Sequence, residues 1–363
     1  MPQNYQLLNP NTDRTTTKTL LHEAIPVTGA ILSATYGTYP NEGNIKNYTH
    51  GMFQSVYDYP YLSSSANHIF DITMGYDESS VLSQSSHTAV MMQKKKINIY
   101  NQMSQVLLGY TGSNNEVEIF ESDLDYGDND RQMRECFFVN FSRLLSKDQI
   151  KPGTFSITLG SGSWSAPYSV GGGGRLTLTD RSASLTQGTK NTPGGTYGVL
   201  YSGSNADSRC GLVFYEAAIV VLSASCFMTG AAETAIGDFY NLDYSSVGKR
   251  SLSASMVSSS ISGNCDALRH RIYDLSYNNT TEINSTIYFC RAPHNAFNYS
   301  SNPTYTTSGK INVKNVASDP PVSYITTVGL YNAQNELLAV AKLSEPLKKD
   351  PSNEITLRVR LDY

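Results

Sequence analysis

The chain is 363 residues long and carries a formal net charge of −4, with only 16% of its residues charged. That length is enough to bury the core of one large domain or of two ordinary ones. Proteins that bind nucleic acids electrostatically present a basic face, so this sparse and slightly acidic charge argues against such a partner. We interpret the basic run of Lys94, Lys95 and Lys96 as the solvated start of a helix.

Tyrosine and cysteine usage indicates the surface chemistry and the redox state. The sequence holds 25 tyrosines and one tryptophan, and tyrosine-rich surfaces are typical of assembly and recognition proteins. The five cysteines form no Cys-x-x-Cys pair, so we expect reduced and mostly buried thiols. We expect no secretory signal and no membrane partner, because no basic and apolar leader and no window of about twenty apolar residues is found.

Composition divides the chain into four regions. Residues 1–60 are polar and then dense in tyrosine, glycine, asparagine and proline, which predicts an extended arm and loop region. The arm either orders on a neighbouring protein or is a disordered tail. We expect residues 61–153 to be helical, 154–250 to be β-rich, and 251–363 to form a helix and a β-sheet. An arrangement in which 251–363 packs with 61–153 as one domain is left open.

Three segments of the first half have helical features. Ser65–Ile72 could open a helix with Ser64 or Ser65 as its cap. Two further segments space apolar residues three or four apart, as one face of a helix does. They are Lys95–Leu108, with Ile97, Tyr100, Met103 and Leu107 before a stop at Gly109, and Arg131–Leu145, with Met133, Phe137, Phe141 and Leu144.

The middle of the chain has strand features. Thr154–Leu159 and Arg175–Thr179 alternate polar and apolar residues, as half-buried strands do. Tyr197–Tyr201 and Leu212–Tyr215 are further strand candidates. Ala217–Ala224 is short and apolar, so its pattern fits a buried strand and a helix equally well.

Ser251–Leu275 returns to a helical period. Its apolar residues step by three and four, like the seam of a short coiled coil. They are Val257, Ile261, Cys265, Leu268, Ile272 and Leu275. The segment is either an ordinary helix facing the core or a helix that packs against its symmetry mate, and in the second case Val257, Ile261 and Leu268 are interface residues.

The last forty-odd residues, Pro320–Tyr363, predict three strands. Two β-rich runs flank the polar turn Asn332–Asn335, which indicates a hairpin. In Ile355–Asp362, apolar and polar residues alternate, so one face should be buried and the other wet. The fold prediction is therefore α+β, with a helical N-terminal half, a β-rich middle section and a C-terminal antiparallel β-sheet.

The outer side chains of this C-terminal sheet are candidate interface residues. Arg358 and Arg360 lie on the polar side of the last strand, and Tyr331 lies beside the hairpin turn. We hypothesise that the two arginines face an acidic neighbour, such as the 116–130 loop of another copy.

Motifs for catalysis and metal binding fail on spacing. Gly248–Ser251 lacks the first glycine of a phosphate-binding loop, and Gly160–Trp164 lacks the last glycine of a nucleophile elbow. In the acidic cluster Asp123–Asp130, Gly127 stands one position before the glycine that a calcium loop requires. Paired carboxylates for glycoside hydrolysis depend on a spatial separation that the sequence does not give. We expect no enzymatic activity, no cofactor and no metal.

Several segments together resemble the virion structural proteins of tailed bacteriophages, especially contractile-tailed phages of the cyanophage type. The resemblance covers about residues 60–363 and is most specific in the closing hairpin. The segments are Ser65–Asp71 with Gly75-Tyr76, Lys95–Met103, Phe138–Leu145, Val328–Asn332 and Leu338–Ser344. It implies a tail or baseplate component of the virion, assembled in the host cytoplasm, that binds other tail proteins and copies of itself.

Three functional hypotheses follow. The first is a structural assembly protein of a phage tail, in the baseplate or at a tail junction. The second is a host receptor-binding or carbohydrate-binding tail-tip protein that uses the loops 36–61 and 160–174. The third is a polysaccharide-degrading enzyme.

Overall fold

The architecture is taken from a computed structural model of the whole chain. It describes residues 5–26, 43–83, 90–110, 117–121, 132–160, 175–184, 188–202, 209–224, 256–257, 259–300, 306–308, 310–311, 318 and 320–363. The chain folds into two compact units. Unit 1 comprises Met1–Leu20 and Glu282–Tyr363, and unit 2 comprises Leu21–Thr281. Both termini of the chain thus belong to the same unit.

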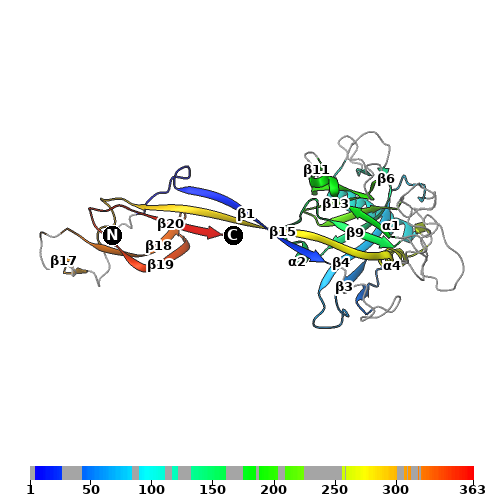
Figure 1. Cartoon of the computed structure of the whole chain (residues 1–363), viewed down its shortest axis with the longest axis horizontal. Helices are drawn as coiled ribbons and strands as arrows, with labels where there is room; N and C mark the ends of the chain where they lie inside the picture. Colours follow the sequence, from blue (N-terminus) through cyan, green and yellow to red (C-terminus); the bar gives the residue numbers. More distant parts are fainter. Residues whose placement is uncertain are drawn as a thin grey trace. The chain divides into compact units, whose positions relative to one another are not determined.

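Unit 2 is built mainly from short antiparallel strands (Figure 1). The strands are β2 (Ile45–Asn47), β3 (Gln54–Tyr57), β4 (His68–Tyr76), β5 (Phe120–Glu121), β6 (Gln132–Met133), β7 (Glu135–Phe141), β8 (Gln149–Ile150), β9 (Ser156–Gly160), β10 (Arg175–Thr179), β11 (Thr189–Thr192), β12 (Gly195–Ser202), β13 (Arg209–Phe214) and β14 (Ile219–Ser223). The helices among the described residues are α1 (Met91–Leu107), α2 (Arg143–Ser146), the 3₁₀ helix η2 (Arg181–Ser184) and α4 (Ile261–Arg271).

Two long strands, β1 (Arg14–Pro26) and β15 (Ile272–Ala292), contribute residues to both units. The remaining strands of unit 1 are β16 (Thr306–Thr307), β17 (Lys310–Ile311), β18 (Ser323–Tyr331), β19 (Leu337–Lys349) and β20 (Ile355–Asp362). In the described part of the chain, the main sheet has 14 strands and the order β1-β15-β9-β10-β12-β13-β14-β7-β4-β3-β2, with β11 on β12 and both β8 and β20 on β15.

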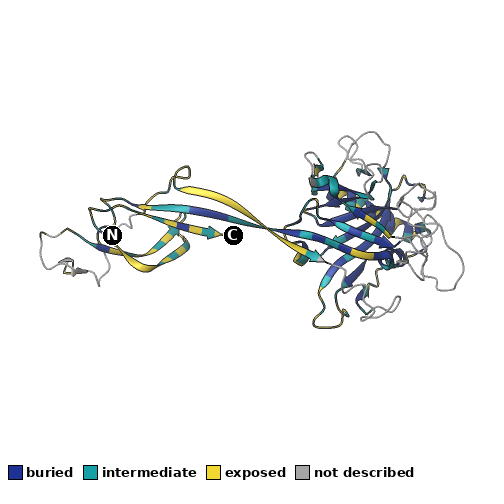
Figure 2. Ribbon diagram, viewed as in Figure 1, coloured by how far each residue is buried: buried dark blue, intermediate teal, exposed yellow. Residues whose placement is uncertain are grey.

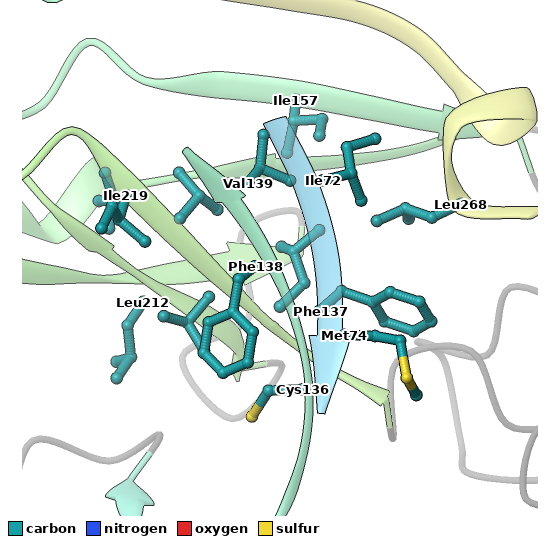
Figure 3. Close-up of a cluster of buried hydrophobic side chains, with 14 of the residues drawn as sticks. Ile72, Met74, Cys136, Phe137, Phe138, Val139, Ile157, Leu212, Ile219 and Leu268 are labelled. Carbon is teal, nitrogen blue, oxygen red and sulfur yellow. The ribbon is translucent and has the colours of Figure 1, made fainter. Parts of the chain in front are cut away.

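The centre of unit 2 is the group β4, β7 and β14, whose strands are buried on both faces. β4 and β7 pair from Phe70 opposite Phe141 to Tyr76 opposite Glu135, and β7 pairs with β14 on its other edge. Figure 3 shows buried side chains from these strands and their neighbours, among them Ile72 and Phe138. Strands covered on both sides read as continuous apolar runs, because neither face meets water.

The sheet curls, so that β7 and β15 face one another. The ring of Phe141 in β7 lies 5.1 Å from that of Tyr277 in β15, although five strands separate β7 from β15 in the sheet. Phe155, just before β9, joins the same cluster at 6.1 Å from Phe141. α4 packs on this face of β4, where the Cys265 thiol donates to the carbonyl of Ile72 (3.3 Å).

α1 covers the other face of β4. The ring of Tyr100 lies 6.3 Å from Phe138, and its hydroxyl donates to the carbonyl of Met133 (2.7 Å). The approach is close at Gly75, where a Cβ would lie only 2.5 Å from the carbonyl oxygen of Lys96. A side chain at that position would displace the helix, so glycine fixes the distance between α1 and the sheet.

The prediction of a helical N-terminal half is wrong, and with it the α+β class, because the described chain is mostly β. The described part of 131–145 forms β6, β7 and the start of the short α2, and Ser65–Ile72 leads into β4. The helical spacing in β7 was misleading because every residue of Cys136–Val139 is apolar and buried on one face or the other. Such a run fits the period of a helix and that of a strand equally well.

Other predicted elements are confirmed. α1 occupies Met91–Leu107, and Gly109 follows with a φ of +101°. The predicted strands of the middle region correspond to β9, β10, β12 and β13, and Ala217–Ala224 contains the strand β14. The four described cysteines form no disulfide bond, and three of them are buried.

The C-terminal strands are also confirmed, with one difference in their pairing. β18 and β19 form the predicted hairpin, while β20 pairs with β15 rather than with the hairpin. Ser251–Leu275 is helical over α4, and at Ile272 the chain continues as β15.

Lys96 is not a solvated residue of the helix start, as the basic run had suggested. Its side chain is fully buried, and its Nζ donates to the carbonyls of Met256 (2.5 Å), Val257 (3.1 Å) and Ser259 (2.8 Å). These carbonyls precede α4, so Lys96 connects α1 to the start of α4. Burial lowers the pKa of Lys96 to about 8, because a buried amine lacks the water that stabilises its charged form.

This lysine predicts a pH dependence of stability. Between pH 8 and the usual lysine pKa of about 10.4, the unfolded chain holds a proton that the folded protein has released. The free energy of unfolding contributed by Lys96 therefore rises with pH across that window. Urea unfolding measures this effect. From pH 7.5 to pH 9.5, the free energy of unfolding should rise more, or fall less, in the wild-type chain than in Lys96→Met.

The matched control is Lys94→Met, because Lys94 is exposed on the same helix. It should keep the wild-type pH dependence. Identical pH profiles for Lys96→Met and wild type would show that Lys96 keeps an ordinary pKa in the folded chain.

Candidate functional site

Unit 1 has an interior that is polar as well as apolar. Lys349, fully buried, donates from Nζ to Oδ1 of Asn298 (2.7 Å) and to the carbonyl of Asp350 (2.9 Å). Ser323 pairs with Lys349 across the hairpin and donates to the carbonyl of Phe297 (2.5 Å). This cluster attaches the base of the β18–β19 hairpin to the segment that follows β15.

The hairpin β18–β19 presents an exposed apolar surface. Leu338 is 69% exposed, Val340 52% and Tyr324 53%. Tyr331 and Leu337 are opposite one another in the pairing and are 44% and 51% exposed. We call these five residues the hairpin patch. Figure 2 shows exposed stretches along this hairpin, whereas the strands of unit 2 are largely buried.

Unit 1 also contains an open strand edge. Every residue of Arg14–Leu20, the part of β1 in this unit, is exposed. Within the described residues, β1 pairs with β15 and with no other strand. Main-chain groups along its outer edge are therefore available to a further strand, which is how exposed edges recruit other chains.

Two of the predicted interface residues in unit 1 have different surroundings. Arg360 donates to Asp362 (2.7 Å) and to Ser285 (3.0 Å), so its guanidinium binds residues of β20 and β15 in its own sheet. The hydrogen bond from Ser285, followed by the one from Arg360, holds the pKa of Asp362 below its ordinary value. Arg358 is exposed on the same side of β20.

Tyr331 lies within the hairpin patch, and its ring lies 5.0 Å from that of Tyr5. The acidic loop proposed to face the arginines lies largely outside the described residues, as do Asp123–Asp130 and residues 161–174.

The predicted seam residues of the helix lie in the interior of unit 2. Ile261 and Leu268 are fully buried, and Val257 packs against the same core. α4 contacts β4 of its own chain. This arrangement is the ordinary core-facing helix, and it leaves the side chains of Ile261 and Leu268 inside the monomer.

The sequence reading missed the exposed residues of β19, Leu338 and Val340. A signal was present, because Leu337–Ala341 is apolar without interruption. Among the described residues, β19 pairs with β18 alone, in a two-stranded sheet. Successive residues of a strand point to opposite faces of the sheet, and a paired strand covers neither face. A consecutive apolar run therefore places apolar side chains on both faces of this hairpin.

Among the described residues, no group of three or more histidine, cysteine or acidic side chains is arranged to hold a metal ion. No helix in the described ranges is both long and apolar enough to span a bilayer.

Comparison with models of known protein families, with curated proteins and with solved structures finds no match to this chain.

The different surroundings of the two arginines give a prediction. Arg360→Glu places a carboxylate beside Asp362 and should lower the free energy of unfolding by about 0.5–1 kcal/mol. Arg358→Glu should change it by less than about 0.5 kcal/mol, as expected for an exposed site. Urea unfolding of the two variants measures the difference, and a larger loss at Arg358 would contradict these assignments.

Proposed function

We propose that this chain is a structural assembly protein of a bacteriophage virion, a tail baseplate or tail-junction component that acts through protein–protein interfaces. Its partners are copies of itself and other tail proteins, and it assembles in the host cytoplasm. The tail location rests on the resemblance of residues 60–363 to virion structural proteins. The assembly function is supported independently by the physical character of unit 1.

The observation that carries the proposal is the comparison of buried with exposed apolar side chains in unit 1. Among its described residues, the buried apolar side chains are Ile287, Ala292 and Val359. The large apolar side chains exposed in the same unit are Tyr5, Leu7, Leu20, Phe297, Tyr299, Tyr324, Tyr331, Leu337, Leu338, Val340, Leu347 and Tyr363. The described part of unit 1 therefore exposes more large apolar side chains than it buries.

Such a balance favours association. Burial of apolar surface contributes about 25 cal/mol per Å², so a partner that covers these exposed side chains stabilises the complex. A small domain with little core of its own gains stability from a bound partner, because the partner binds the folded state alone.

We expect the first partner to be a second copy. The formal charges of unit 1 nearly cancel, so electrostatic repulsion between two copies of this unit is weak. The hairpin patch combines tyrosines with aliphatic side chains, a composition that is enriched at interfaces. The open edge of β1 adds main-chain donors and acceptors that a strand of another copy can pair with.

The test is self-association of the purified chain. The double variant Leu338→Asp with Val340→Asp should remain monomeric in sedimentation velocity over a range of concentrations at which the wild type associates. Both residues are largely exposed, so the variant should keep the circular dichroism spectrum of the wild type.

Ser344→Asp is the matched control, since Ser344 is exposed on β19 outside the hairpin patch. It should associate as the wild type does. A wild-type chain that stays strictly monomeric, and that mass spectrometry does not find in intact particles, would refute the proposed function.

A further inference from the structure

A cavity of about 350 Å³ lies in unit 2, lined by residues of α1, of β4 and β7, and of the loop before β3. The lining residues are His50, Met52, Phe53, Asp71, Thr73, Ile99, Gln102, Met103, Phe138 and Asn140. Its size is within the range of small-ligand sites, which combine apolar walls with a few converging polar groups.

The polar end of the cavity is formed by Asp71 and Asn140. They are directly opposite partners in the pairing of β4 with β7, and directly opposite side chains lie on the same face of a sheet, with Cβ atoms about 5 Å apart. Ser55 donates to Oδ1 of Asp71 (2.5 Å), and Nε2 of His68 lies 2.8 Å from the same oxygen. These two contacts fix the orientation of the carboxylate.

The other polar atoms of this pair remain available. Within the described contacts, Oδ2 of Asp71 and the amide of Asn140 have no hydrogen-bond partner in the protein. Gln102 brings a second, exposed amide from α1. The cavity therefore offers one carboxylate acceptor and two amides that each donate and accept.

The apolar wall is held in place from two sides. The ring of Phe53 lies 4.7 Å from Tyr48 and 5.0 Å from His50, so three rings form one cluster. The hydroxyl of Thr73 donates to the carbonyl of Met52 (2.6 Å). The amine of Lys95 donates to the carbonyl of His50 (2.9 Å), which attaches this loop to α1.

From this arrangement we infer that the cavity binds a neutral sugar. Hydroxyl groups both donate and accept, so they match a carboxylate and two amides, whereas an organic cation has no use for amide donors. The C–H face of a sugar ring matches Phe53 and the neighbouring methionine side chains. Asp71 and Asn140 bind the hydroxyls. This ligand site is independent of the assembly function and would add a recognition function to it.

The experiment uses the full chain and free monosaccharides as probes. Saturation-transfer NMR with glucose, galactose, mannose and N-acetylglucosamine should show transfer from the protein to at least one of them. Asn140→Leu and Asp71→Asn should each weaken binding of that sugar by about tenfold, the loss expected for one or two hydrogen bonds.

Asn98→Leu is the control, because Asn98 is exposed on α1 and does not line the cavity. It should bind as the wild type does. Circular dichroism identifies a variant that fails to fold. In that case the wild-type chain is used with phenol as a weak apolar probe, and the bound sugar should compete with phenol for the cavity.

Two results would overturn the inference. They are no transfer to any of the four sugars, and equal sugar binding by the wild type and both cavity variants. Neither of them bears on self-association, so the assembly proposal stands or falls separately.

Discussion

The pairing of β4 with β7 is the constraint on which the rest of unit 2 depends. Each strand has apolar residues on both faces, so the pair is stable only when layers cover both sides. α1 covers one face at the distance set by Gly75, and α4 covers the other, where Leu268 is buried. The same pairing places Asp71 opposite Asn140, and these polar residues interrupt the apolar face at the cavity.

Part of this fold was predictable from the sequence. α1 was found because its buried residues keep a helical period, and β20 was found because its exposed face alternates with its covered one. β7 was missed because Phe137 and Phe138 are buried on opposite faces, so the run has no period of its own. The assembly of unit 1 from both ends of the chain depends on the long-range pairing of β1 with β15, which local patterns do not encode.

The candidate sites were harder to predict for the same reason. Arg358 was chosen from alternation and Tyr331 from its place beside the hairpin turn, and both residues are exposed on their strands. Arg360 was equivalent to Arg358 in the sequence, but its partner Ser285 lies 75 residues away along the chain. The polar end of the cavity depends on the register of two strands that are about 70 residues apart, which only the folded chain reveals.

The described core of the molecule lies in unit 2, and we propose that a partner covers the exposed apolar side chains of unit 1. Hydrogen exchange followed by mass spectrometry on the dilute chain tests it most directly, because amides in a buried core open least often. We expect slow exchange in β4 and β7, fast exchange in β18 and β19, and protection of β18 and β19 at concentrations where the chain associates. Exchange in β18 and β19 as slow as in β7 in the dilute chain would contradict it.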